Sequence, residues 1–543
     1  MASGATPWTP VVVKTTEIIG HQRTPDITNV SRDGGFSFLI EDKVVWVYDD
    51  TQCMSEQGRI LSFVSNSAAY ASNVEDTISE VRDFHIEEVR GAQGREGRAI
   101  EQGDAVNGGG GWIPFNQDEI DFNNDHRNRE RIAIWPATAP TALVDNQAFI
   151  FAPLTYVDEL QQHTDRMFKS RGITLVSIEL RHWGPQATRQ NDLMFPDTEV
   201  PFGGFSAVVG YASTDRDPNR RGDDTDIYVL GKTASGLQLA RAPASQIMDH
   251  DAYKYYEPRT RTFTDQTPDP NITGPEDLYL TGSFSNGNLF WSPYFGTFVL
   301  VYFNHMADSK FYMRYLDLDN PLNDTSAIWT AGGRLGNGIQ GGDAEALIRY
   351  AWSPEQEVFA TPPGPGGYNY AGQAHPEYFN RQYYPRTAFT PTEDPPGRLN
   401  RWFGSSEVEE DDAGGDGKHL LVSWTSQIRG GTSSGIYEIM LARIEFGDIP
   451  PKPGQGEPPR WTTLSHHRPS DGPPGSGQSS SDASSQRFAP RPDAMNGHGP
   501  GMNDHELDMN GRDPTPDVER QFFNLARFLV TALAAVLAAA VMF

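Results

Sequence analysis

The amino-acid sequence predicts an all-β fold, and three observations support this prediction. Short apolar runs rich in β-branched and aromatic residues recur along the chain between turn-rich gaps. The composition, with 53 Gly and 40 Pro in 543 residues, favours many short strands and many turns. No long amphipathic helical pattern competes with the strands. About five groups of three or four strands fit the span, and repeated sheets of this size are typical of a β-propeller.

The strands are expected in the apolar runs. These runs are residues 36–48, 60–64, 142–154, 173–180, 205–212, 227–230, 237–241, 289–303, 311–316, 346–352, 358–360, 420–424 and 437–444. Long loop insertions at 91–111, 214–226 and 379–417 make their spacing irregular. The spacing alone therefore does not fix the number of blades.

The globular domain is expected over residues 15–448, because the composition changes beyond it. Residues 449–516 are rich in Pro, Gly and Ser and predict a disordered linker. Residues 521–543 are mostly apolar, long enough for a C-terminal hydrophobic helix that spans a bilayer. This segment predicts a tail anchor or a removable lipid-anchor signal, with a soluble helix as the alternative. No N-terminal signal peptide is visible, yet we expect a membrane-anchored protein at the cell surface or in the secretory pathway.

Charge and cysteine content exclude several classes of function. The net charge of −28 opposes binding to a phosphate backbone, so we predict no nucleic-acid partner. The single cysteine, Cys53, allows no intramolecular disulfide and no cysteine-rich zinc site. No dense Asp/Asn loop of the kind that binds calcium is present in the sequence. We therefore predict neither a metal nor a cofactor.

The most informative stretch is a predicted hairpin at 32–51. If its turn lies at 41–42, residues whose numbers sum to 83 face each other, and Asp33 lies opposite Asp50. The same register pairs Gly35 with Tyr48, Ser37 with Trp46, and Leu39 with Val44. Both faces of this hairpin are apolar, which predicts burial on both sides.

Directly opposed carboxylates destabilise a strand pair. At about 5 Å and an effective dielectric of about 20, the repulsion is on the order of 3 kcal/mol. A chain that keeps Asp33 and Asp50 in facing positions is expected to use them. The alternative is that each is only a turn residue, Asp33 before two glycines and Asp50 before Thr51.

Further motifs carry a resemblance to a known family. They are Arg32-Asp-Gly-Gly with Asp49-Asp-Thr51, Gly111-Trp-Ile-Pro-Phe115, Arg131-Ile-Ala-Ile-Trp-Pro136, Tyr370-Ala-Gly-Gln-Ala-His-Pro376 and Leu420-Leu-Val-Ser-Trp-Thr425. Over about residues 20–446, the chain resembles an uncharacterised-domain family (domain of unknown function 4185) of five-bladed propellers. That family is related to the endo-D-arabinanases of glycoside hydrolase family 183.

The resemblance implies a five-bladed propeller that cleaves carbohydrate near its axis, with Asp33 and Asp50 as the catalytic pair. Many relatives have Gly-Asp-Thr where this chain has Asp49-Asp50-Thr51. The additional carboxylate of Asp49 is expected to contact substrate or to shift the pKa values of the site.

Glycoside hydrolysis requires this kind of pair. One carboxylic acid protonates the leaving oxygen, and a second carboxylate attacks the anomeric carbon or activates water. Two acids that lie close together do not ionise equally, so their pKa values separate. Facing positions on a hairpin allow carboxyl separations that suit either a retaining or an inverting reaction, and both remain open.

Three further residues are candidates for substrate binding. Trp112 follows a run of glycines and is the best candidate for a sugar platform, with core packing as its alternative. Glu119 follows it and is a candidate additional acid, with surface solvation as its alternative. His375 lies in a predicted loop and is expected to bind substrate or orient an acid, with a structural hydrogen bond as its alternative.

Three functions fit these observations. The first is a membrane-tethered, endo-arabinanase-like glycoside hydrolase that acts on cell-wall or extracellular polysaccharide. The second is a non-catalytic carbohydrate-binding propeller at a cell surface. The third is a tail-anchored scaffold for protein interactions.

Overall fold

The fold was analysed in a computed structural model. The structure describes residues 8–25, 27, 29–40, 43–55, 60–71, 79–83, 111–125, 127, 130–136, 138, 141–144, 147–158, 167–181, 184–211, 225–292, 294–303, 308–322, 346–364, 369–378, 418–428 and 436–448. All of them belong to one compact unit, which includes Met1–Pro450. The predicted linker and the hydrophobic C-terminal segment lie outside these residues. Among the described helices, none combines the length and the apolar character needed to cross a bilayer.

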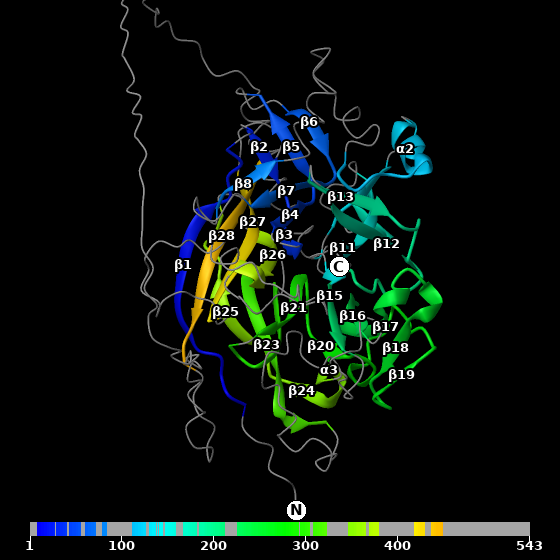
Figure 1. The fold of residues 1–543 in the computed structure, drawn as a ribbon, viewed down its shortest axis with the longest axis vertical. Helices are drawn as coiled ribbons and strands as arrows, with labels where there is room; N and C mark the ends of the chain where they lie inside the picture. Colours follow the sequence, from blue (N-terminus) through cyan, green and yellow to red (C-terminus); the bar gives the residue numbers. More distant parts are fainter. Residues whose placement is uncertain are drawn as a thin grey trace, which may run out of the picture. The chain divides into compact units, whose positions relative to one another are not determined.

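The described residues form an all-β fold with few and short helices, as predicted (Figure 1). The α-helices are α2 (Gln117–Asn124) and α3 (Ala346–Arg349). The single-turn 3₁₀ segments are η2 (Ala244–Gln246), η3 (His250–Ala252), η4 (Pro275–Asp277) and η5 (Pro376–Tyr378).

The N-terminal part of the chain forms two sheets. A four-stranded sheet has the order β3 (Phe36–Ile40), β4 (Lys43–Tyr48), β7 (Ser67–Ala71), β8 (Val81–Asp83). A smaller sheet beside it has the order β2 (Val30–Arg32), β5 (Thr51–Met54), β6 (Ile60–Val64).

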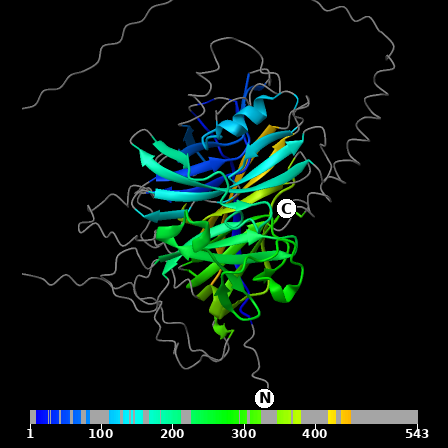
Figure 2. The same cartoon turned by 90° about the vertical axis from the view of Figure 1, so that its right-hand side faces the viewer.

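Two larger sheets follow in the sequence. The four-stranded sheet is counted as the first, and the smaller sheet beside it is left out of the count. The second sheet then contains β9 (Glu130–Ile134), β10 (Thr141–Val144), β11 (Gln147–Asp158), β12 (Phe168–Arg181), β13 (Gly184–Arg189) and β14 (Phe195–Pro196). The third contains β15 (Ser206–Tyr211), β16 (Thr225–Lys232), β17 (Gly236–Pro243), β18 (Lys254–Glu257), β19 (Thr262–Thr264) and β20 (Leu280–Thr281). Figure 2 shows the cyan strands of the second sheet beside the green strands of the third.

The C-terminal part of the described residues forms two more sheets. The fourth contains β21 (Asn286–Ser292), β22 (Thr297–Phe303), β23 (Lys310–Pro321), β24 (Tyr350–Trp352) and β25 (Gln356–Ala360). The last contains β26 (Asn369–His375), β27 (His419–Ile428), β28 (Ile436–Phe446) and the N-terminal strand β1 (Val13–His21).

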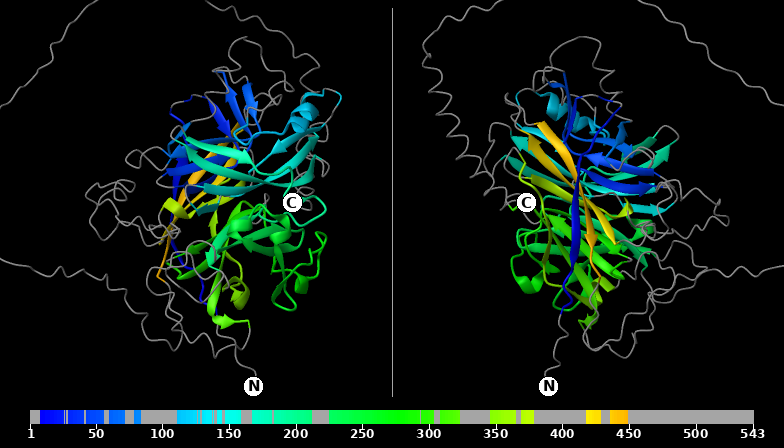
Figure 3. Two further views of the ribbon diagram at one scale, coloured as in Figure 1. Left: turned by 45° about the vertical axis from the view of Figure 1, so that its right-hand side comes forward. Right: turned by 90° about the vertical axis from the view of Figure 1, so that its left-hand side faces the viewer.

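The first strand completes the last sheet. β1 pairs antiparallel with β28, from Val13 opposite Phe446 to His21 opposite Met440. Figure 3 shows the blue strand lying along the orange one. No strand was predicted from the sequence at this position, because the β1 side chains are mostly exposed and lack an apolar run. The pairing joins residues more than 400 positions apart and ties the start of the chain to its last sheet.

The core is divided among the spaces between neighbouring sheets. Phe151 and Val229 belong to one cluster, which joins the second sheet to the third. Trp46 and Leu441 belong to another, which joins the four-stranded first sheet to the last. One edge strand of each sheet, here called its leading strand, also contacts the leading strand of the next sheet. The contacts are β3 with β10, β10 with β15, β15 with β21, β21 with β26, and β26 with β3 again. The contacts therefore return to the sheet where they began, and the arrangement is propeller-like.

Most predicted strands are present, with one correction. Residues 346–352, predicted as a strand, begin as helix α3 and become extended only at β24. The run 289–303 does fold as the hairpin β21–β22, which turns at residues that include Gly296. Gly296 has a φ of 62°, a conformation that glycine adopts without strain.

Candidate active site

The first hairpin has the register that the sequence predicts. Ser37 pairs with Trp46 and Leu39 with Val44 across β3 and β4. The side chains of both strands are almost all buried, as the apolar character of both faces indicates. The small side chain of Ser37 opposite the indole of Trp46 is consistent with close packing in this sheet.

The antiparallel pairing does not end at the acids, however. Beyond them β2 pairs with β5 in the same register, with Arg32 opposite Thr51. The Asp33 amide donates to the Asp50 carbonyl oxygen at 2.9 Å, and the Asp49 amide donates to the Asp33 carbonyl oxygen at 2.8 Å. The acids therefore lie at an irregular junction between the four-stranded sheet and the smaller one, where these two backbone hydrogen bonds join the chain segments.

Gly34 allows this close arrangement. Its φ is 61°, in the left-handed region that favours glycine. A Cβ atom at this position would lie 2.6 Å from Oδ2 of Asp49. The glycine thus makes room for the Asp49 carboxylate directly beside the backbone that carries Asp33.

Asp50 is held by two side chains that follow one predicted motif. Nη2 of Arg131 lies 3.3 Å from its Oδ2, and Nε1 of Trp135 donates to its Oδ1 at 2.8 Å. The Arg131 and Asp50 side chains are only 13% and 16% exposed. A guanidinium ion and an N–H donor both favour the ionised carboxylate.

Asp33 is held by different groups. The Gly34 amide donates to its Oδ1 at 2.6 Å. The side chains of Tyr370 and Thr425, from strands β26 and β27 of the last sheet, also hydrogen-bond to its carboxyl group. The Gly34 amide is shared with Oγ1 of Thr425 at 3.0 Å.

Four of the five motifs noted in the sequence therefore meet at these acids. Arg131, Tyr370 and Thr425 were not predicted as site residues, although each stands at one end of a quoted motif. Their position in those motifs was the only signal, because nothing in one sequence shows that distant sheets meet.

The three acids differ in their tendency to ionise. Burial, and then the neighbouring Asp50 carboxylate, raise the pKa of Asp33 from 3.8 to about 7, although the Tyr370 and Thr425 hydrogen bonds oppose this. Burial, and then the carboxylates of Asp33 and Asp50, raise the pKa of Asp49 well above its ordinary value. Oδ1 of Asp49 is buried and accepts no hydrogen bond from the described residues. Asp33 and Asp49 are therefore harder to ionise than free aspartates, beside an Asp50 that faces a cation.

Trp112 does not present a sugar platform in this structure. It is 7% exposed, belongs to a core cluster of the first and second sheets, and donates from Nε1 to the Pro185 carbonyl at 2.9 Å. These contacts favour its structural alternative, core packing.

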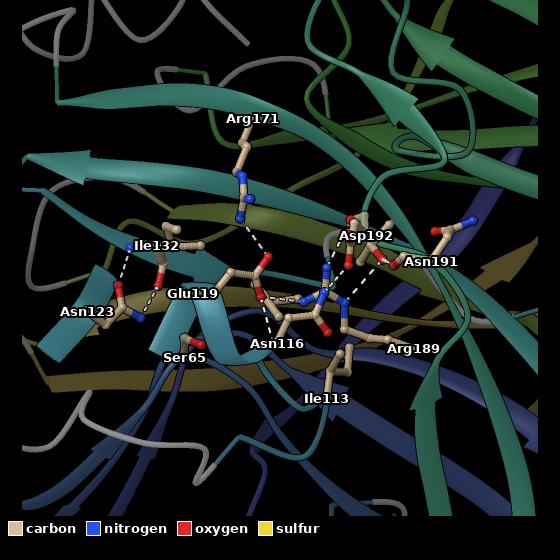
Figure 4. Close-up of polar contacts among 12 residues, drawn as sticks. Ser65, Ile113, Asn116, Glu119, Asn123, Ile132, Arg171, Arg189, Asn191 and Asp192 are labelled. Carbon is tan, nitrogen blue, oxygen red and sulfur yellow. Dashed lines mark hydrogen bonds and ion pairs between the residues drawn. The ribbon is translucent and has the colours of Figure 1, made fainter. Parts of the chain in front are cut away.

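Glu119 lies in α2, in a cluster of ion pairs that does not include the hairpin acids (Figure 4). It is 2% exposed, pairs with Arg171 at 2.6 Å and with Arg189, and accepts the Asn116 amide at 3.0 Å. The last contact is half of a capping box, which satisfies a free amide at the start of the helix. Surface solvation, the expected alternative, is wrong, and a buried structural role fits these contacts.

His375 is completely buried, with an exposed fraction of 0%. Its Nδ1 lies 2.5 Å from Oγ of Ser37, and its Nε2 lies 2.7 Å from Oγ of Ser423. Burial lowers the pKa of His375 to about 3, so the ring is neutral. Both nitrogens are engaged by buried serines, which favours the structural hydrogen bond over contact with substrate.

A separate cavity of about 530 Å³ lies at the third sheet. Its lining residues are Asp226, Arg241, Ala242, Pro243, Gln246, Asp249, Asp251, Ala252 and Lys254. None of them belongs to the acid cluster, so this cavity contributes nothing to the candidate site.

Comparisons with known proteins give only distant likenesses. No family model matches the chain, and no curated protein matches it. A candidate hydrolase from Bacteroides ovatus is similar in structure, with a TM-score of 0.41 and 12% identity over 76% of this chain and 85% of the other. A complex of BT0996 with RGII has a TM-score of 0.35 and 8% identity over 80% of this protein and 92% of the other.

A glycoside hydrolase gives similar values, with a TM-score of 0.34 and 10% identity over 80% of this chain and 92% of the other. Likenesses of this size establish neither a family nor an activity for this chain. The resemblance to the uncharacterised-domain family therefore stays a prediction from the sequence motifs.

Proposed function

We propose that the chain is a glycoside hydrolase that acts on a polysaccharide through Asp33 and Asp50. The observation that carries the proposal is the unequal environment of two facing acids. Burial and then the neighbouring Asp50 raise the pKa of Asp33, whereas Asp50 lies beside Arg131 and an indole N–H. Glycoside hydrolysis needs one protonated and one ionised carboxyl group in a single site.

The environments assign the roles. Asp33 is the general acid, which gives its proton to the glycosidic oxygen as the bond to the leaving sugar breaks. Asp50 is the carboxylate, which attacks the anomeric carbon or takes a proton from the attacking water. The account holds for a retaining or an inverting reaction.

We further propose that the sheets are the five blades of a propeller and that β2, β5 and β6 extend the first blade. The closed succession of contacts among β3, β10, β15, β21 and β26 supports this. In a propeller the leading strands surround the axis, and loops at one end line the binding site. Asp33, between β2 and β3, and Tyr370, near the start of β26, come from the blades where the ring closes.

Tethering by residues 521–543 remains part of the proposal and is tested separately. Deleting these residues is expected to move the protein from the membrane fraction to the soluble fraction. Unchanged fractionation would remove the tether from the proposal and would leave the chemistry untouched.

The activity is tested by incubating the full chain with a panel of cell-wall polysaccharides. Arabinans are included because of the sequence resemblance, and release of reducing ends is measured. Asp33→Asn and Asp50→Asn should each lower the rate by about a thousandfold, within the usual effect of a catalytic acid or base. Hydrolysis that persists in either variant would contradict the assignment, and binding without hydrolysis by the wild type would favour a carbohydrate-binding protein.

The chain offers a matched control for these substitutions. Asp226 also pairs with an arginine, Arg241, at 3.5 Å, and its side chain is 13% exposed. It therefore resembles Asp50 in burial and partner but lies in the third sheet. Asp226→Asn is expected to leave the hydrolysis rate within twofold of the wild type.

A further inference from the structure

Tyr370 connects the last sheet to the acid of the first. It lies in β26 directly opposite Thr425 in β27. Both side chains hydrogen-bond to the Asp33 carboxyl group. One cross-strand pair thus presents two hydroxyl groups to a single acid that another sheet carries.

The backbone beside Tyr370 is irregular at this point. Tyr370 pairs with Thr425, but the next pair is Gln373 with Ser423, so β26 has one residue more than β27 between these pairs. This is a β-bulge, which bends a strand and changes the direction of nearby side chains. Bulges are frequent next to active sites.

The bulge has an energetic cost that its surroundings must offset. Ala371 has a φ of 49°, a left-handed conformation that costs a residue with a Cβ atom on the order of 1 kcal/mol. Gly372 follows, and a Cβ atom there would overlap the ring of Phe303. Strain of this kind persists where packing fixes it, and it is concentrated at functional sites.

We propose that Tyr370 is a positioning residue, which the Ala371–Gly372 bulge turns toward Asp33 so that its hydroxyl group orients the Asp33 carboxyl. This inference rests on the proposed function and deepens it. The proton moves from Asp33 to the glycosidic oxygen, and Tyr370 keeps its own proton. Its O–H then donates to the carboxylate that the transfer leaves behind, which favours the ionised form.

The other charged groups around Asp33 are known from the same structure. Asp49 and Asp50 face it from the hairpin, and Arg131 acts on it through Asp50. None of these changes in a Tyr370→Phe variant. The variant therefore removes one hydrogen bond and leaves the charges in place.

The test uses full-length Tyr370→Phe on the polysaccharide that the wild type cleaves. We expect kcat to fall about 10- to 100-fold with KM within about twofold, because the lost interaction acts on proton transfer. The upper limb of the pH profile should move to higher pH, because the ionised form of Asp33 loses a donor. A kcat within twofold of the wild type, or an unmoved limb, would overturn the proposal.

Two other variants complete the set. Tyr253→Phe is the matched control, because the Tyr253 hydroxyl donates to the Ile247 carbonyl at 2.9 Å in the segment between β17 and β18. It should change neither kcat nor the pH profile. Thr425→Val removes the second hydroxyl group and replaces Tyr370→Phe in the test if that variant does not fold. It should also lower kcat and move the upper limb of the pH profile to higher pH.

A second readout does not depend on activity. The Asp33 carboxyl is titrated by ¹³C NMR in the full-length protein labelled at aspartate, with Asp33→Asn used to assign its signal. The midpoint should rise in Tyr370→Phe and stay unchanged in Tyr253→Phe. An unmoved midpoint in Tyr370→Phe overturns the proposal even if the wild type hydrolyses polysaccharide. If the midpoint rises in Tyr370→Phe but the wild type hydrolyses no polysaccharide, the proposed function is overturned and the coupling between Tyr370 and Asp33 is retained.

Discussion

Among the described residues, two clusters that combine acids with arginines are built in opposite ways. At α2, the single carboxylate of Glu119 lies between two guanidinium groups, Arg171 and Arg189. At the first hairpin, three acids lie close together, and one of them, Asp50, pairs with Arg131. Both clusters contain residue types that the sequence marks as candidates for chemistry.

The difference shows what separates a structural acid from a reactive one. Glu119 has a hydrogen-bond or ion-pair partner for each oxygen, so its charge is compensated and it has no capacity left for a substrate. At the hairpin, burial and then the neighbouring carboxylates raise the pKa of Asp33 and that of Asp49, so both acids are harder to ionise. An excess of acid over base in a half-buried site is what general acid catalysis needs.

The largest expected effect is on the hydrolysis rate, and it distinguishes the two clusters because a substitution in the α2 cluster should instead affect the free energy of unfolding. Asp50→Asn should lower hydrolysis by about a thousandfold and leave the free energy of unfolding within about 1 kcal/mol, because it also removes repulsion. Glu119→Gln, by contrast, should affect unfolding more than turnover per folded molecule. Rate measurements and chemical denaturation of both variants check this, and the opposite pattern would break the comparison.

Removing the Glu119 carboxyl altogether should be severe for stability. Glu119→Ala leaves Arg189, whose side chain is 4% exposed, without its carboxylate partner. Breaking a buried ion pair in this way costs about 3 to 5 kcal/mol. Urea unfolding measures the loss, and Lys254→Ala, at a pair with exposed members, is the control, with less than about 1 kcal/mol expected. A small loss in Glu119→Ala would mean that the α2 cluster contributes little to the fold.

The hairpin acids should make stability depend on pH. Burial and the neighbouring Asp50 raise the pKa of Asp33 from 3.8 to about 7 in the folded protein, so the folded state binds more protons between these values. The free energy of unfolding should therefore fall as pH rises from about 4 to about 7. The drop is on the order of 2 to 4 kcal/mol, toward the lower value because the carboxyl is partly exposed. Denaturation across this range measures it, and an equally steep fall in Asp33→Asn would assign it to other groups.

Asp49 gives the smallest effect and sharpens the comparison within the site. Asp49→Asn removes one of three neighbouring acids and should stabilise the protein by about 1 kcal/mol at pH 8. The pKa of Asp33 and the upper limb of the activity profile should stay as in the wild type, because burial and Asp50, and not Asp49, raise the pKa of Asp33. Thermal unfolding and a pH–rate profile measure both quantities, and a limb that moves would show that Asp49 also influences the pKa of Asp33.

The sequence predicted the strands and the first hairpin well, because both depend on local alternation and register. The facing of Asp33 and Asp50 follows from a rule that needs only the turn position. The sequence did not predict β1 in the last sheet, since that pairing joins distant residues and an exposed strand leaves no apolar run. It also could not show whether Glu119 or His375 is buried among partners, because partner residues come from other strands.

The central claim is that Asp33 supplies the proton and Asp50 acts as the carboxylate. Aryl glycosides of the sugar that the wild type cleaves test it most directly, with leaving groups that range from poor to good. Asp33→Asn should lose activity on poor leaving groups and recover much of it on good ones, which need no acid. Asp50→Asn should remain inactive on poor leaving groups and good ones alike. A loss in Asp33→Asn that is equal for every leaving group would contradict the assignment.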